Sequence, residues 1–186
     1  MAARDLRIRA AGSAILIALA AGAPAAAQDR AMEYAVKATY LYKFAPFVEW
    51  PPRAFASASS PLQLCVLGRD PFGATLDRAV SGQRVDGRPV KVQRLQRVDA
   101  ASGCHILYLG ASSSQTRPEA LRAVRGSPTL TVADSDGDPG AIIRFVVTGA
   151  RVRFDIDAAA AAAAGVTISS KLLSLAMSVR GGGEAS

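Results

Sequence analysis

Histidine and cysteine are scarce in this chain, which has one His and two Cys among its 186 residues. A closed zinc site takes its ligands from several such side chains, and Cys65 and Cys104 do not form a C-x-x-C pair. The single histidine, His105, lies in an apolar stretch, which is more typical of a residue satisfied in the core or at a strand end than of a general base. The sequence therefore predicts neither a metal site nor catalysis by histidine.

Other catalytic and ligand-binding motifs are also missing. Residues 169–171 (Ser-Ser-Lys) lack the S-x-x-K spacing of penicillin-binding enzymes, and no G-x-S-x-G motif is present. Residues 134–138 begin like a calcium loop, but Pro139 and Phe145 occupy positions that require Gly and Glu, so we interpret this segment as a surface turn. Residues 68–73 match neither glycine-rich nucleotide motif. We therefore predict a protein that is not an enzyme and needs no cofactor.

Long hydrophobic runs are missing as well. The apolar stretch at residues 10–21 is shorter than the about 20 residues that a membrane-spanning helix needs. It follows three arginines and precedes Ala-Ala-Ala at residues 25–27, and together these features form the pattern of a secretory signal peptide. We expect residues 1–27 to be removed and the product to be exported without spanning the membrane.

The charge that remains after this cleavage is moderately basic. Removing three Arg and one Asp from 22 basic and 15 acidic residues leaves a net charge of +5. For an exported protein, such a charge favours an acidic protein, an anionic membrane surface or a cell-wall polymer over nucleic acid. Residues 28–180 have the length of one domain, and the glycine-rich end at residues 181–186 is expected to be disordered.

Export also bears on the two cysteines. In an oxidising compartment, a disulfide between Cys65 and Cys104 is the leading interpretation. Both residues lie in apolar, strand-like runs, so the alternative is a pair of reduced cysteines that pack as small apolar side chains.

Strand-like and helix-like patterns alternate through most of the chain. Residues 31–45 have helical periodicity up to Pro46, and residues 62–67 form an apolar run typical of a strand buried on both faces. Asp70 is placed to cap a helix that starts at Pro71. The pattern predicts a single-domain α/β fold, with a mostly parallel sheet flanked by helices and a C-terminal antiparallel β-hairpin. A turn followed by a strand is expected within residues 85–92, further strands at 104–109 and 128–132, and further helices at 116–124, 158–164 and 166–176.

The expected hairpin lies within residues 142–157, where apolar and polar residues alternate. With a two-residue loop, Arg144 falls opposite Arg153. Like charges directly opposed on a sheet are unfavourable, so this pair needs an acidic neighbour. Asp155 or Asp157 could supply it within the hairpin, and otherwise an acidic partner could supply it from outside.

Aromatic residues make up only 6% of the chain, yet five of them fall within residues 37–51. Helical spacing predicts one buried stripe, which consists of Val36, Tyr40, Phe44 and Phe47 and is widened by Leu41 and Val48. Three aromatic residues fall off this stripe: Tyr42, Trp50 and Phe55. Exposed aromatic side chains mark binding surfaces, so we hypothesise that these three contact a protein partner or a second copy of the chain.

Several short motifs extend in order over nearly the whole chain after the signal peptide. They are Glu33-Tyr34, Val36-Lys37-Ala38, Tyr40-Leu41-Tyr42, Phe44, Phe47-Val48-Glu49-Trp50-Pro51, Leu64-Cys65-Val66-Leu67-Gly68, Asp70-Pro71-Phe72-Gly73, Cys104-His105-Ile106-Leu107, Arg151-Val152-Arg153-Phe154 and Ile168-Ser169-Ser170-Lys171-Leu172-Leu173. Together these motifs resemble the YfiR family of periplasmic proteins.

The resemblance implies a non-enzymatic periplasmic repressor. Such a protein binds the periplasmic region of a membrane-anchored diguanylate cyclase, and so lowers cyclic di-GMP and biofilm formation. It also implies an α/β protein that can form a homodimer and respond to redox state through its cysteines. Cys65 and Cys104 match the family pattern, whereas a second cysteine pair found in some relatives is absent here.

The expected partner-binding residues are therefore Tyr42, Trp50, Phe55, Arg144 and Arg153. The alternative function is a periplasmic sensor that binds a small molecule. In that case an aromatic pocket between the first helix and the hairpin would hold the ligand and control release of the partner.

Overall fold

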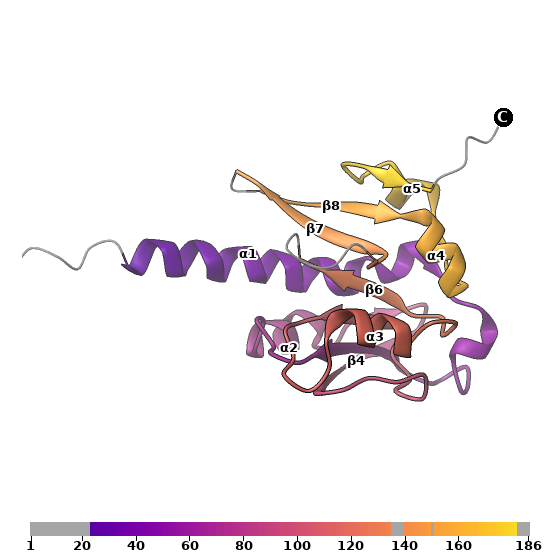
Figure 1. Ribbon diagram of the computed structural model, residues 1–186. Coiled ribbons are helices and arrows are strands. Elements are labelled where there is room, and N and C mark those ends of the chain that lie inside the picture. Colours follow the sequence, from indigo (N-terminus) through magenta and orange to yellow (C-terminus); the bar gives the residue numbers. More distant parts are fainter. Residues whose placement is uncertain (1–22, 135–139, 150, 182–186) are drawn as a thin grey trace, which may run out of the picture.

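The computed structural model describes residues 23–134, 140–149 and 151–181, which form one α/β domain (Figure 1). An eight-stranded sheet has the order β10-β8-β7-β6-β5-β2-β4-β3, and a two-stranded sheet pairs β1 with β9. The adjacent strands β4, β2, β5, β6 and β7 are parallel to one another, while β3 runs antiparallel to β4 and β8 runs antiparallel to β7. The predicted fold class is confirmed, including the antiparallel C-terminal hairpin.

The elements have the following bounds. The α-helices are α1 (Ala23–Lys43), α2 (Ala74–Val80), α3 (Arg117–Ala123), α4 (Ala158–Ala164) and α5 (Ser170–Leu173), and two 3-10 helices are η1 (Ala45–Phe47) and η2 (Pro52–Ala54). The strands are β1 (Val48–Glu49), β2 (Leu62–Leu67), β3 (Arg84–Val85), β4 (Arg88–Leu95), β5 (Ile106–Leu109), β6 (Leu130–Ala133), β7 (Ile143–Thr148), β8 (Arg151–Asp157), β9 (Thr167–Ile168) and β10 (Val179–Arg180).

The sheet has a hydrophobic core on each face. On β2, Leu64 and Val66 point into the core that α1 and α2 cover, while Cys65 and Leu67 point into the core that α3 covers. This confirms that the apolar run at residues 62–67 is a strand buried on both faces, as is typical of parallel sheets.

Helix α1 differs from its prediction in length and in its buried face. It begins at Ala23 and passes through the expected cleavage position, whereas the predicted start was residue 31. Its fully buried side chains include Ala38, Leu41 and Phe44, while Val36 is 44% exposed. The predicted stripe was therefore wrong at Val36, because the helix is rotated so that the neighbouring Lys37 faces inward.

Lys37 can be buried because a cluster of polar side chains surrounds it. Its Nζ lies 2.6 Å from Oδ1 of Asp134, the residue that follows β6, and also contacts Glu33. The hydroxyls of Tyr34 and Tyr108 both donate to Oδ2 of Asp134, at 3.2 and 2.7 Å. Asp134 is thus buried, in contrast to the surface turn predicted for residues 134–138; residues 135–138 lie outside the described residues.

These contacts also explain the charge states in the cluster. Burial by itself would lower the pKa of Lys37, but the hydrogen bonds to Asp134 and Glu33 outweigh it and the pKa is raised. Burial together with the charge of Asp134 raises the pKa of Tyr108. Lys37 therefore stays a cation and Tyr108 stays a hydrogen-bond donor throughout the neutral range.

The hairpin has a different register from the one predicted. Thr148 pairs with Arg151, and Arg144 lies opposite Asp155 instead of Arg153. The turn begins at Gly149, whose φ of +60° suits a residue without Cβ, so the loop starts one residue later than expected. A shift of two in the pairing leaves every side chain on the same face, so the predicted inward row of apolar residues is preserved.

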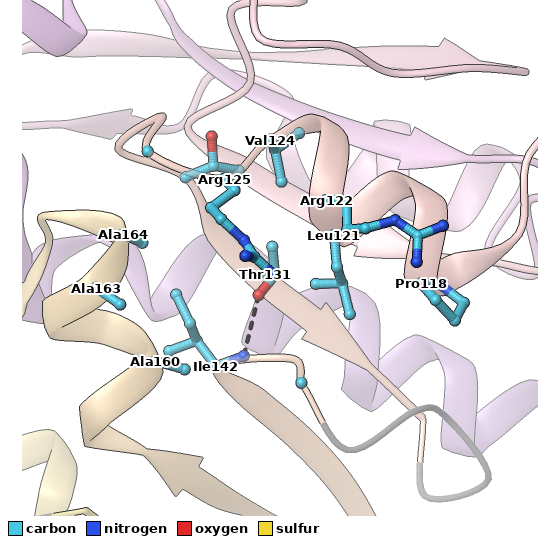
Figure 2. A pocket seen from close by; sticks show the side chains of 13 residues that line it. Pro118, Leu121, Arg122, Val124, Arg125, Thr131, Ile142, Ala160, Ala163 and Ala164 are labelled. Carbon is cyan, nitrogen blue, oxygen red and sulfur yellow. Dashed lines mark hydrogen bonds between the residues drawn. The ribbon is translucent and has the colours of Figure 1, made fainter.

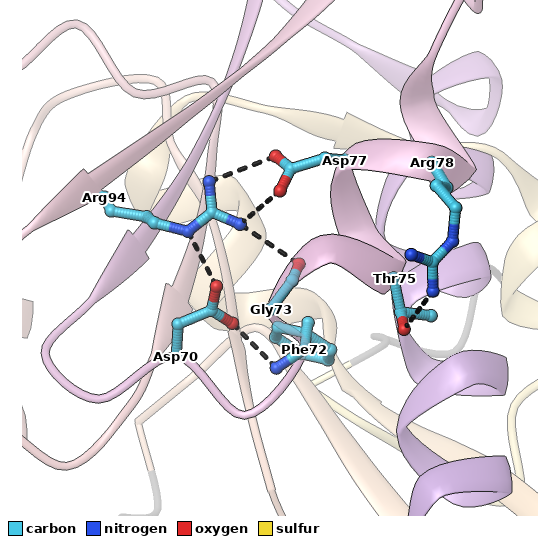
Figure 3. A network of polar contacts seen from close by, with 7 residues as sticks. All are labelled: Asp70, Phe72, Gly73, Thr75, Asp77, Arg78 and Arg94. Atoms are coloured by element: carbon cyan, nitrogen blue, oxygen red, sulfur yellow. Dashed lines mark hydrogen bonds and ion pairs between the residues drawn. The ribbon is translucent and has the colours of Figure 1, made fainter.

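Two predicted helix boundaries were wrong. Asp70 does not cap a helix at Pro71: its Oδ1 accepts the backbone N–H of Phe72, and α2 starts at Ala74 (Figure 3). Its Oδ2 binds Arg94 of β4, which also pairs with Asp77 of α2. Of the helix expected at residues 166–176, only α5 forms, because residues 167–168 pair with β1 as strand β9.

Strands β2 and β5 form the point at which the strand order reverses. In open α/β sheets, ligands typically bind beside the carboxyl ends of the strands at such a point. Here two glycines bring the loops into contact: a Cβ on Gly68 would lie 2.3 Å from the carbonyl oxygen of Ala111, and one on Gly110 would lie 2.3 Å from that of Leu67. Backbone atoms therefore fill this position.

The buried cluster yields a prediction about stability. The substitution Asp134→Ala should lower the free energy of unfolding by about 3–5 kcal/mol, because it removes one partner of a buried ion pair. Asp77→Ala is the matched control: its ion pair with Arg94 is exposed, and such a pair is worth at most about 1 kcal/mol. Urea unfolding measures both changes, and equal losses would contradict this role of Asp134.

Candidate functional site

Trp50 and Phe55 lie next to each other at the amino-terminal edge of the parallel strands. Trp50 follows β1 and Phe55 follows η2, and the two rings meet edge to face with centroids 6.5 Å apart. Both side chains are half-buried. The turn of chain from Pro51 to Ala54, where two prolines restrict the backbone, holds them in this arrangement.

The imidazole ring of His105 packs against the ring of Phe55. The two rings stack with centroids 4.2 Å apart and an interplanar angle of 18°. Nδ1 of His105 accepts the backbone N–H of Gln63 at 3.0 Å, and Nε2 lies 2.9 Å from the carbonyl oxygen of Ala54, to which it donates. Burial, reinforced by the charge of Arg88, lowers the pKa of His105 despite the bond to Ala54, so the ring is neutral.

Arg88 completes this group of side chains. Its guanidinium carbon lies 3.8 Å from the centroid of the Phe55 ring, a cation–π contact. Nη1 donates to the carbonyl oxygens of Ser57 and Ser60, at 2.8 and 2.9 Å. The arginine therefore ties the segment after Phe55 to β4 and is itself held in one orientation.

A groove of about 650 Å³ opens beside these residues. Trp50, Phe55 and Arg88 line it, together with the backbone turn between β3 and β4 at Asp86. Nε1 of Trp50 is buried and has no hydrogen-bond partner among the described residues. A buried donor without a partner costs about 1–3 kcal/mol, so the position of this indole has an energetic cost.

The disulfide ties strand β2 to the residue that precedes His105. Cys65 of β2 and Cys104 form a disulfide, with their Cα atoms 5.7 Å apart. The structure therefore contains the predicted bond and not two reduced cysteines. Because Cys104 directly precedes His105, the bond fixes the chain at the point where His105 stacks on Phe55.

The remaining predicted site residues lie elsewhere. Tyr42 is half-buried on α1 against the core and does not line the groove. Arg144 and the exposed Arg153 share the face of the hairpin that points away from α1. Nη2 of Arg144 lies 2.7 Å from Oδ2 of Asp155, which is the internal acidic neighbour that the sequence suggested.

The carboxyl-terminal half of α1 packs directly against the hairpin. Tyr40 and Phe44 of α1 contact Phe145 and Phe154 of the hairpin, with ring centroids 5.1 to 6.2 Å apart. Aromatic side chains therefore fill the part of this interface where an aromatic ligand pocket was expected. A cavity of about 520 Å³ remains between α1 and the hairpin, near Met32 and Val147, and its described lining includes no aromatic residue.

The sequence did not identify Arg88 as a lining residue of the groove, His105 as the residue that stacks on Phe55, or Lys37 with Asp134 as a buried pair. No local signal identified these residues, because each acquires its role through a contact at least 28 residues away along the chain. The one available hint was that Lys37 lies about one helical turn before Leu41 and about two turns before Phe44, both of which are buried.

The side chains that could suggest catalysis have structural roles. Oγ of Ser169 accepts the backbone N–H of Leu172 and caps α5. In the described part of the chain, His, Cys, Asp and Glu side chains form no group of three or more that could hold a metal ion. No described helix is both long enough and apolar enough to cross a membrane.

Comparison with protein-family models matches residues 34–177 to the model described as YfiR/HmsC-like. The chain belongs to the YfiR/HmsC-like family. The matched region contains the groove, the disulfide and the buried Lys37–Asp134 pair, so all of these belong to the YfiR/HmsC-like domain. This family is periplasmic and regulatory rather than catalytic.

His105 is the only histidine in the chain, so its titration can be measured without interference from another imidazole. Its pKa in the folded protein lies below the value of about 6.5 expected when unfolded. Its contribution to stability should therefore be complete above pH 6.5 and be lost as the pH falls below that value, because the unfolded chain binds the proton first.

The test is urea unfolding at pH 7.5, 6.5 and 5.5 for the native chain and for His105→Asn. The variant should be less stable at pH 7.5 but lose less stability between pH 7.5 and 5.5. The same pH dependence in both proteins would contradict a buried, neutral His105.

Proposed function

We propose that the chain is a periplasmic repressor that binds the periplasmic region of a membrane-anchored diguanylate cyclase and so lowers cyclic di-GMP. The single observation that carries this proposal is the YfiR/HmsC-like match over residues 34–177. A disulfide-bonded domain in which His105 and Ser169 are engaged in structural hydrogen bonds supports a binding role.

The groove at Trp50 is the proposed docking surface for the cyclase. Tryptophan and arginine are enriched among the residues that dominate binding energy at protein interfaces, and here both line one concave site. Phe55 and Arg88 are already held by His105 and by backbone carbonyls, so little side-chain entropy would be lost on binding.

Arg153 is the second proposed contact. Asp155 neutralises Arg144, which leaves Arg153 and Arg151 as exposed cations on the outer face of the hairpin. Exposed charges of this kind accelerate association with an acidic partner more than they strengthen the final complex. Tyr42 remains a weaker candidate because it packs on the core, and formation of a homodimer remains a prediction.

The test is co-purification from cells that lack the native gene and express a tagged chain. Mass spectrometry should identify an inner-membrane protein with a diguanylate cyclase domain, and cyclic di-GMP should fall when the tagged chain is expressed. Recovery of no cyclase, together with unchanged cyclic di-GMP, would refute the function.

Variants then locate the surface. Trp50→Ala should reduce the recovered cyclase about tenfold or more, which corresponds to the loss of one dominant interface residue. Trp50→Phe keeps an aromatic ring at this position and should therefore bind the cyclase better than Trp50→Ala. Arg153→Glu should weaken recovery, whereas the matched control Arg78→Glu on α2 should not. Equal recovery for all four variants would exclude this surface.

A further inference from the structure

A second cavity, of about 490 Å³, lies between α3 and α4 above strand β6 (Figure 2). Its volume is within the range of small-molecule sites in proteins. It shares no lining residue with the groove at Trp50. Any ligand it takes would therefore leave the proposed docking surface free.

The cavity exists because one of its walls carries only methyl groups. Ala160, Ala163 and Ala164 lie on one side of α4, a helix of seven consecutive alanines. Leu121 of α3 forms the opposite wall, and Ile142 lies between them at the base (Figure 2). The surface offered to a ligand is therefore mainly hydrocarbon.

Two arginines give the cavity its charge. Arg122 and Arg125 line it, and among the described residues its lining contains no carboxylate. Neither arginine forms an ion pair within the described part of the chain. Figure 2 shows Arg125 extending from the end of α3 towards Thr131 and Ile142, whereas Arg122 points the other way in this view.

A buried hydroxyl lies at the same place. Oγ1 of Thr131 accepts the backbone N–H of Ile142 at 3.0 Å, and the side chain is almost wholly buried. No acceptor for its own proton is found among the described residues. Thr131 can therefore donate to a ligand atom that Arg125 also reaches.

We propose that this cavity binds a small organic acid with an apolar body. The guanidinium of Arg125 and the hydroxyl of Thr131 bind the carboxylate, and the alanine face of α4 packs against the hydrocarbon part. This inference goes beyond the regulator function and does not depend on it, because it rests on the cavity alone.

Octanoate is the probe for isothermal titration calorimetry with the purified chain. It should bind at one saturable site, while 1-octanol, which lacks the charge, and acetate, which lacks the apolar body, should bind at least about tenfold more weakly. A charge-assisted hydrogen bond is worth about 1.5–3 kcal/mol, which corresponds to about a tenfold change or more. Absence of octanoate binding, or equal binding of 1-octanol, would overturn the proposal.

Three variants assign the site. Arg125→Gln should weaken octanoate binding about tenfold, and Arg78→Gln, an exposed arginine on α2, is the matched control that should bind normally. Ala163→Leu should abolish binding, because its longer side chain fills the cavity from an exposed helix position that tolerates leucine. Circular dichroism checks that each variant folds. Unchanged affinity in both Arg125→Gln and Ala163→Leu would place the ligand elsewhere and overturn the proposal.

Discussion

The buried contact between Lys37 and Asp134 is the constraint on which the rest of the structure depends. It joins the middle of α1 to the carboxyl end of β6, across nearly a hundred residues. An unpaired charge in the core is strongly unfavourable, so the lysine fixes how α1 is rotated about its axis. That rotation directs Ala38, Leu41 and Phe44 into the core and places Phe44 against the rings of the hairpin.

The position of the groove follows from the same arrangement. Once Phe44 is fixed, the chain turns through η1 and enters β1, whose pairing with β9 carries it to Trp50. A separate restraint acts from the sheet, where the disulfide and the hydrogen bonds of His105 hold the ring beneath Phe55. Two independent parts of the core thus determine a half-buried aromatic surface, which suits a protein that recognises a partner with little rearrangement.

Local signals predicted much of the fold, and contacts distant in sequence account for the errors. Two elements could be predicted from their own residues alone. They are the strand at residues 62–67, an apolar run, and helix α4, a run of alanines that ends at Gly165. The hairpin register depended on which residues form the turn, and apolar alternation cannot distinguish pairings that differ by two. Strand β9 forms only because it pairs with β1. Within the site, Trp50 and Phe55 could be singled out from the sequence as aromatic residues off the buried stripe. The contacts of His105 and Arg88 with Phe55 could be seen only in the folded structure.

The contact between the loops at Gly68 and Gly110 has a consequence for how this domain could change over time. In related sheet architectures, the corresponding crevice holds nucleotides, and new chemistry arises by exchanging side chains around it. Here main-chain oxygens occupy that crevice, so no single exchange of side chains would reopen it. A descendant of this chain could gain such an activity only by remodelling two loops together, and new functions should therefore arise more readily elsewhere on its surface.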